Sequence, residues 1–312
     1  MVKMEKSRFN VARKILIFWT LFIGVGAVLG SVMMFVDPSG KTMGMAGMLP
    51  YFKKLPFADV LFNDLLFSGF ALLFVNGISN LTAAALVLMK KKIGVTLGMI
   101  FGITLMLWIC IQFYMFPFNF MSTIYFVFGF CQAATGYASL VFFKQEQFVV
   151  NENDYPNVGT NDKLLVVYFS RMGYVKKKSY EEADRTGAVV YEIKATERTE
   201  GTAGFWWCGR YGMHRWGMPI EPIDIDLTKF QKVTIFSPIW VFALSAPVRE
   251  FCKQSAGKIK NADYVFVHHT NGLYASAADE ADKFLGIKRS SLKSIVCRKG
   301  DYIKELTEKN NA

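Results

Sequence analysis

Residues 163–173 read Lys163-Leu-Leu-Val-Val-Tyr-Phe-Ser170-Arg-Met-Gly173, an apolar run that ends in a hydroxyl side chain and a glycine. A short, continuous apolar run bounded by turn residues is typical of a strand buried inside a parallel sheet. When such a strand passes through a tight glycine turn into a helix, the free backbone N–H groups of the turn can hold a phosphate group. We therefore expect a phosphate-holding loop at residues 170–175.

The rest of this half of the chain alternates short apolar runs with helical segments. The pattern predicts strands at 164–169, 188–193, 232–236, 264–268 and 292–297, and helices at 176–185, 247–255, 275–285 and 302–308. This alternation predicts an α/β domain with a doubly wound, five-stranded parallel sheet and helices on both faces. Ligands bind such sheets outside the carboxyl ends of the strands, where the strand order reverses.

The composition changes abruptly near Lys144. Before this point the chain has four long apolar stretches, at 15–36, within 60–89, at 93–116 and at 120–143. Each is long enough to cross a hydrocarbon core of about 30 Å as a helix, and the first is too long for a signal peptide. We predict a four-helix transmembrane domain over residues 1–144, a polar linker over 145–162 and the α/β domain over 163–312.

Positive charge is concentrated in the membrane half, with 12 Lys and Arg against 4 Asp and Glu in residues 1–144, compared with 24 against 21 in residues 145–312. Nine of these twelve cations flank the expected inner ends of the helices: Lys3, Lys6, Arg8, Arg13, Lys14, Lys90, Lys91, Lys92 and Lys144. The positive-inside rule then predicts a multi-pass plasma-membrane protein with both termini and the α/β domain in the cytoplasm. Membrane lipid is the expected partner. A nucleic-acid partner is not expected, since the excess charge flanks apolar helices and forms no basic face on the soluble domain.

Some polar and small residues interrupt the apolar stretches. The polar ones are Asp64, Asn76, Asn80 and Gln112. We favour hydrogen bonds between helices over a conduction or quinone site, and we expect Asp64 near the outer end of its span. Gly94, Gly98 and Gly102 share one helix face, which favours close helix packing.

Three loops of the α/β domain, in the right order along the chain, resemble those of flavodoxins over residues 163–309. The first loop is Ser170-Arg171-Met172-Gly173-Tyr174-Val175. The second is Pro238-Ile239-Trp240-Val241-Phe242, followed by a helix that starts at Pro247-Val248-Arg249. The third is Thr270-Asn271-Gly272, directly after His268-His269. The second loop is the most specific of the three.

The resemblance implies a non-covalently bound FMN. In such a site the first loop holds the phosphate, Trp240 and Phe242 form one wall of the isoalloxazine, and residues 270–272 line the ring edge. For Trp240 a place in the buried core is the alternative.

The first loop departs from the flavodoxin pattern at Met172 and Val175, where the family usually carries hydroxyl side chains. Each lost charge-assisted hydrogen bond removes about 1.5–3 kcal/mol of binding free energy. Arg171 and the run Lys176–Lys178 could compensate by charge, although a lysine run is also typical of a solvated helix face. Weak FMN binding and no FMN binding therefore both stay open.

The aromatic stretch 204–217 contains three tryptophans and is interpreted as a loop that caps the flavin, binds a partner or lies against the membrane interface. The cysteines and histidines show no metal-ligand spacing and no disulfide pattern, and no catalytic side chain is assigned. Two functions remain. One is FMN-mediated electron transfer from a cytosolic donor to a quinone or a redox protein partner, and the other is a sensor or interaction module attached to the membrane domain. The oligomeric state is not predicted.

Overall fold

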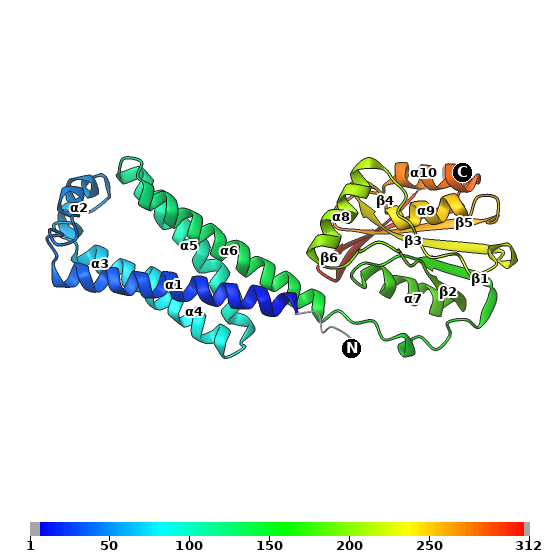
Figure 1. Cartoon of the computed structure of the whole chain (residues 1–312), viewed down its shortest axis with the longest axis horizontal. Coiled ribbons are helices and arrows are strands. Elements are labelled where there is room, and N and C mark those ends of the chain that lie inside the picture. Colours follow the sequence, from blue (N-terminus) through cyan, green and yellow to red (C-terminus); the bar gives the residue numbers. More distant parts are fainter. Residues whose placement is uncertain (1–6, 309–312) are drawn as a thin grey trace. The chain divides into compact units, whose positions relative to one another are not determined.

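The computed structural model describes residues 7–308, and the chain divides into two compact units, Met1–Glu146 and Gln147–Ala312 (Figure 1). The first unit is helical. Its elements are α1 (Arg8–Val36), the short helices η1 (Ala46–Lys54) and α2 (Ala58–Leu61), α3 (Leu66–Leu72), the π-helix η2 (Leu73–Ile78), α4 (Ser79–Leu88), α5 (Lys92–Met115) and α6 (Phe120–Glu146). Four helices in the described residues are long and apolar enough to cross a membrane: Arg8–Val36, Leu66–Leu88, Lys92–Met115 and Phe120–Glu146. The prediction of four long apolar helices is confirmed.

The glycines of α5 set the spacing of this unit. A Cβ atom on Gly102 would lie 2.5 Å from the backbone nitrogen of Ala133 in α6, and one on Gly94 would lie 2.6 Å from the backbone nitrogen of Val87 in α4. Any side chain at these positions would push the helices apart. Close backbone contact through small residues is the usual way in which apolar helices pack in a membrane.

Buried amide side chains link the same helices. The Nε2 of Gln132 donates to Oδ1 of Asn80 at 2.7 Å and to the carbonyl of Gly98 at 2.7 Å. The Nδ2 of Asn80 donates to the carbonyl of Asn76 at 2.8 Å. The two bonds of Gln132 join α6 to α4 and α5, which is the helix-linking role favoured for Asn80, whereas the side-chain amide of Asn76 has no hydrogen-bond partner among the described residues. Asp64 lies before α3, and its carboxylate accepts the backbone N–H of Leu66 at 2.8 Å.

The second unit is an α/β layer structure (Figure 1). Its elements are η3 (Glu152–Asp154), β1 (Asn161–Tyr168), α7 (Tyr174–Thr186), β2 (Ala188–Glu192), α8 (Gly201–His214), η4 (Leu227–Lys229), β3 (Lys232–Trp240), β4 (Ala243–Leu244), α9 (Ala246–Gln254), β5 (Ala262–His268), α10 (Ala275–Leu285), β6 (Ser291–Arg298) and β7 (Asp301–Thr307). The strand order is β2-β1-β3-β5-β6-β7, with β4 paired to β3. The order reverses at β1 and β3, so the crevice at their carboxyl ends is where such a sheet binds ligands.

Alternating residues of β1 supply the two halves of the core. Leu165 and Val167 belong to a large apolar cluster that includes residues of α9 and α10, whereas Val166 and Tyr168 belong to a second cluster that includes residues of α7. Figure 1 shows α9 and α10 on one face of the sheet and α7 on the other. Helices therefore cover both faces, as the doubly wound pattern predicts.

The five predicted strands are present and parallel, as β1, β2, β3, β5 and β6. The prediction of a sheet of five strands only, with a final helix at 302–308, is wrong, because the sheet in the described residues also contains the antiparallel strands β4 and β7. Arg298 pairs with Asp301 across a two-residue turn, in which Lys299 and Gly300 have φ of 55° and 93°. A turn with two left-handed residues matches the twist of a hairpin, so the chain folds back onto β6 as β7 instead of starting a helix. A similar hairpin at 241–242 prolongs β3 to Trp240 and creates β4.

Residues 147–160, which the sequence analysis places in the linker, pack on the second unit. Tyr155 lies against the α7 cluster, and its ring centroid is 5.5 Å from that of Tyr180. Glu152 pairs with Lys176 at 2.6 Å. The segment is thus bonded to α7 before β1 begins.

Candidate functional site

The first loop of the site connects β1 to α7. Gly173 has φ of 84° and is the residue before the first turn of α7. A glycine is favoured in this left-handed conformation, and it has no side chain with which to cap the helix. The first N–H groups of α7 therefore keep their capacity to bind an anion, which the helix dipole also favours.

Ser170 supplies the one aliphatic hydroxyl of this loop, and Tyr174 supplies a phenolic one. The Oγ of Ser170 is buried and has no hydrogen-bond partner among the described residues. A buried hydroxyl without a partner costs about 1–3 kcal/mol, so native structures seldom keep one unless a partner arrives from outside the chain. The role of Ser170 as a phosphate ligand stays a prediction, and its Oγ is available for a hydrogen bond.

The two departures from the flavodoxin pattern differ in their surroundings. Val175 is 4% exposed and packs in the α7 cluster with Val166 and Tyr180. Met172 is half-buried. The core on this side of the sheet therefore includes the position where the family usually presents a hydroxyl to the phosphate.

The cations near the loop make contacts within the protein. Arg171 Nε donates to the carbonyl of Thr199 at 2.6 Å, and Arg171 Nη2 donates to the carbonyl of Gly201 at 2.7 Å, which ties the loop to the start of α8. Lys176 pairs with Glu152 and Lys178 pairs with Glu181, at 2.6 and 2.7 Å. For the lysine run these ion pairs favour the solvated-face interpretation.

Phe148 is a residue of this site that sequence reasoning missed. A Cβ atom on Gly173 would lie 3.1 Å from Cδ1 of Phe148, and one on Gly300 would lie 3.0 Å from its Cδ2. The Phe148 ring also meets the Tyr174 ring edge-on, with centroids 4.6 Å apart. The phenyl ring therefore packs directly on the loop between β1 and α7. A single aromatic residue in a polar segment gave no signal of this contact.

The second loop is a strained hairpin turn. Trp240 pairs with Ala243, which leaves Val241 and Phe242 as the turn, with φ of 48° and 61°. Two successive non-glycine residues in the left-handed region are costly, above all when one is β-branched, and such strain is concentrated at functional sites. Phe242 is 68% exposed, so the turn presents a phenyl ring at the carboxyl edge of the sheet.

Trp240 itself is half-buried and packs against the core. Its ring packs edge-on against Phe169, with centroids 5.5 Å apart, and contacts the small cluster around Cys208 of α8. A Cβ atom on Gly212 would lie 3.3 Å from Cβ of Trp240. This packing favours the core alternative for Trp240. Pro238 and Ile239 precede it in β3 and are half-buried.

The third loop follows β5. Thr270 and Asn271 are exposed, Gly272 is half-buried, and the Thr270 hydroxyl hydrogen-bonds to that of Tyr274. His268, at the end of β5, is 7% exposed, and neither ring nitrogen has a hydrogen-bond partner among the described residues. Burial lowers the pKa of His268, so its imidazole is neutral at neutral pH.

The aromatic stretch 204–217 is helical over most of its length, so its interpretation as a loop is wrong. Gly204 and Gly212 are buried in α8, and a Cβ atom on Gly204 would lie 2.4 Å from the backbone carbonyl carbon of Thr199. The glycines permit close packing at these points and do not break the helix. The opposite side of α8 carries exposed aromatic rings, with Trp206 71% exposed.

The three predicted loops follow the carboxyl ends of β1, β3 and β5, which are parallel neighbours in the sheet. The structure therefore brings Ser170, the turn 241–242 and the loop 270–272 to one edge. Ser170 and the start of α7 can hold an anion there, and Phe242 offers an aromatic face to a planar ring.

Comparison with known proteins gives similarity at the level of solved structures. No family model matches the chain, and no curated protein matches it. A flavoprotein in complex with FMN from Lactobacillus acidophilus NCFM is 17% identical and covers 42% of this chain and 91% of its own, with a TM-score of 0.37. A candidate flavoprotein from Bacteroides eggerthii is 18% identical and covers 42% of this chain and 86% of its own, with a TM-score of 0.38. A third, from Bacteroides uniformis, is 19% identical and covers 42% of this chain and 87% of its own, with a TM-score of 0.37.

Proposed function

We propose that this chain is a membrane-anchored, flavodoxin-like redox protein that binds FMN non-covalently and passes electrons between a cytosolic donor and a membrane acceptor such as a quinone. The observation that carries the proposal is the buried Ser170 hydroxyl without a partner, beside the uncapped first turn of α7. The unpartnered hydroxyl and the free N–H groups match the needs of a phosphate monoester.

Ser170 and the backbone N–H groups at residues 173–175 would hold the phosphate. The exposed Phe242 and the loop 270–272 would lie along the ring system, since both follow carboxyl ends of the central strands. FMN, when bound, supplies the electron-transfer chemistry, and the protein supplies position and electrostatics. With Val175 packed in the core and Met172 lacking a hydroxyl, we expect weaker binding than the flavodoxin pattern gives.

The four apolar helices would anchor this module in the membrane. Cations lie at the start of α1, at the α4–α5 turn and at the end of α6, and the positive-inside rule then puts both termini in the cytoplasm. Reporter fusions at the C-terminus test this topology. An external C-terminus would contradict it.

One observation favours a second function, an interaction module without FMN. The Phe148 ring packs on Gly173 at the loop that would hold the phosphate, and the phosphate-side position 175 is apolar. A loop covered in this way by its own chain suits a scaffold that has lost its ligand.

Titration of the detergent-purified full chain with FMN and with riboflavin, followed by flavin absorbance and fluorescence, separates the two functions. The redox proposal expects a perturbed flavin spectrum and binding of FMN at least about tenfold tighter than riboflavin, because only FMN offers the phosphate. Equal affinity would remove the phosphate loop from the site. Absence of any spectral change with either flavin would favour the interaction module.

A further inference from the structure

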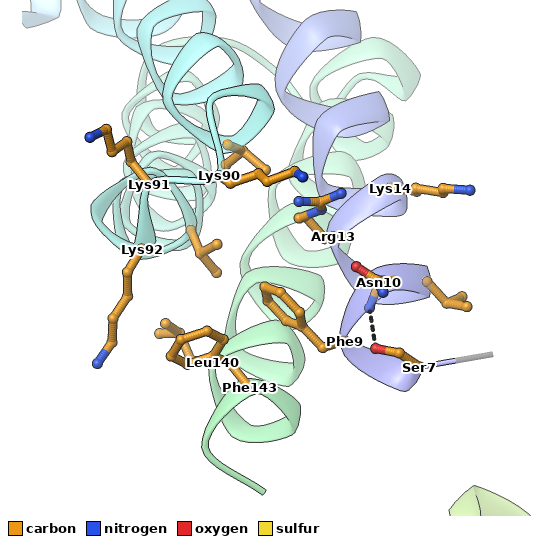
Figure 2. Close-up of a pocket in the computed structure, with 13 residues that line it drawn as sticks. Ser7, Phe9, Asn10, Arg13, Lys14, Lys90, Lys91, Lys92, Leu140 and Phe143 are labelled. Atoms are coloured by element: carbon orange, nitrogen blue, oxygen red, sulfur yellow. Dashed lines mark hydrogen bonds between the residues drawn. The ribbon is translucent and has the colours of Figure 1, made fainter. Parts of the chain in front are cut away.

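The first unit contains a pocket at the end where α1 begins and α6 ends, with a volume of about 800 Å³ (Figure 2). Its walls come from α1, from the end of α4 with the following turn, from α5 and from α6. Pockets of this size hold ligands much larger than a simple ion. The FMN proposal does not use this part of the chain.

Five cations line the pocket: Arg13, Lys14, Lys90, Lys91 and Lys92. Among residues 7–308, none of the five has an ion-pair partner in the structure. The carboxylate of Glu146 lies at this end of the unit. Its oxygens accept hydrogen bonds from the hydroxyl of Ser7 at 2.7 Å and from the backbone N–H of Phe9 at 3.0 Å, and it pairs with none of the five cations. The pocket therefore lacks counter-charge among its described neighbours.

Two of these cations face each other. Figure 2 shows the side chains of Arg13 and Lys90 pointing toward one another between α1 and the α4–α5 turn. The Nε of Arg13 is buried and has no hydrogen-bond partner among the described residues. Like charges brought together near an apolar wall repel each other, and an anion between them would reverse the sign of that interaction.

The backbone at this turn supports the same conclusion. Lys90 has φ of 59° and follows Met89, the C-cap residue of α4, at a position where helices usually end in glycine. The next helix, α5, begins after Lys91 without a side-chain cap. N–H groups of its first turn therefore point out of the helix end and can donate hydrogen bonds to an anion.

The other walls of the pocket are mostly apolar. They include Phe9, Val87, Val95, Leu140 and Phe143. Cations at the ends of long apolar helices are typical of the boundary between hydrocarbon and water, where basic pockets between helices receive anionic lipid head groups. An inorganic ion would use the cations and leave the apolar walls uncovered.

We propose that this pocket binds a phosphate-bearing amphiphile, an acidic phospholipid, with the phosphate between Arg13 and Lys90 and an acyl chain along Val87 and Val95, which lie inward of Lys90. The bound lipid would join α1 to the α4–α5 turn at this end of the unit. The proposal holds whichever side of the membrane this end faces, and it does not depend on FMN binding.

The test measures lipid retention by the detergent-purified full chain with native mass spectrometry. The probes are phosphatidylglycerol and phosphatidylcholine with the same acyl chains, and glycerol phosphate as the soluble head group. We expect phosphatidylglycerol to bind at least about tenfold more tightly than phosphatidylcholine, and glycerol phosphate in excess not to displace it. Equal retention of the two lipids would overturn the proposal. Displacement by glycerol phosphate would also overturn it, because the ligand would then be a soluble phosphate.

Two charge-removing variants of α1 locate the site. Arg13→Gln should weaken phosphatidylglycerol binding by about tenfold or more, because it removes the charge-assisted donor at the pocket. Arg8→Gln is the matched control, since Arg8 lies over the Phe142 ring at 5.2 Å and does not line the pocket. If Arg13→Gln fails to fold, Lys90→Gln takes its place, with the same expectation. Equal losses in the control and in the pocket variant would indicate general surface charge and overturn the assignment.

Discussion

Replacing Ser170 by alanine should have opposite effects on stability and on FMN binding. The Oγ of Ser170 is buried without a partner among the described residues, so in the cofactor-free protein the hydroxyl has lost its hydration and gained no hydrogen bond. Removing it relieves a desolvation cost of about 1–3 kcal/mol, less the small packing contribution of one atom. We therefore expect Ser170→Ala to leave the cofactor-free second unit unchanged or to stabilise it.

For FMN the same substitution removes a hydrogen-bond donor to a charged phosphate. Such a bond contributes about 1.5–3 kcal/mol, which corresponds to a loss of roughly tenfold to a hundredfold in affinity. The affinity for riboflavin should not change, because riboflavin has no phosphate.

Hydrogen exchange of sheet amides in β1 and β3 measures the stability of the second unit inside the full chain. Flavin titration of the same preparation gives the affinity. Ser294→Ala is the matched control, since Ser294 is also a serine without exposed hydroxyl surface, but its hydroxyl donates to the carbonyl of Leu273 at 2.8 Å. That control should lose about 0.5–1.5 kcal/mol of stability, the usual net value of a satisfied hydrogen bond.

Two results would refute this reasoning. If Ser170→Ala destabilised the cofactor-free unit as much as Ser294→Ala, the hydroxyl would have a structural partner in solution. If FMN affinity stayed unchanged while the protein remained folded, Ser170 would not be a phosphate ligand, and the proposal for the loop would fail with it.

Three further predictions concern the packing around the site. Trp240→Ala should lower the free energy of unfolding of the second unit by up to about 3 kcal/mol, because the half-buried ring packs on Phe169. Trp240→Phe should keep most of that stability and leave the flavin spectrum unchanged; an altered spectrum in the stable Phe variant would place Trp240 against the flavin instead. Arg249→Leu should lower the free energy of unfolding by about 3–5 kcal/mol, since the fully buried guanidinium pairs with Glu280 at 2.8 Å and its removal leaves that carboxylate unpaired. The double variant with Arg249→Leu and Glu280→Leu should recover part of that loss in the same hydrogen-exchange measurement, because neither charge then remains. Burial lowers the pKa of His268 in the folded protein below its unfolded value of about 6.5, so its contribution to stability is full above that pH and is lost as the pH falls below it. His268→Gln should flatten this dependence of the free energy of unfolding on pH, and an unchanged dependence would show that another group causes it.

The sequence was sufficient for the features that depend on local periodicity. The core strands have continuous apolar runs and the long helices have continuous apolar stretches, so both appear close to their predicted places, and the helix predicted at 275–285 has those bounds. The two added strands and α8 depend on other signals. The hairpin that creates β7 rests on two left-handed residues, and α8 tolerates its glycines because Gly204 and Gly212 lie against Thr199 and Trp240. Neither contact is visible from periodicity.

The candidate site was predictable where it follows strand ends and unpredictable where distant segments meet. The loop at Ser170 and the turn at Phe242 could be placed because parallel strands bring their carboxyl ends to one edge. The ring of Trp240 packs against α8, a helix that the sequence did not predict. A packing role and a flavin-binding role for this ring therefore could not be separated from the sequence. Phe148 reaches Gly173 from outside the predicted domain, through a contact that no local pattern encodes.

The strand at the end of the chain changes how the α7 face of the sheet is covered. A final helix at 302–308 would have covered part of that face, but β7 extends the sheet instead. The segment 147–160 contributes there, since Tyr155 and Val158 pack on the same cluster as Tyr302, and Phe148 continues the layer to Gly173. Moving this segment would break the Glu152–Lys176 pair and uncover apolar surface, so it behaves as part of the domain. Because the same segment carries Phe148, the chain that enters the second unit also shapes the loop where an anion would bind.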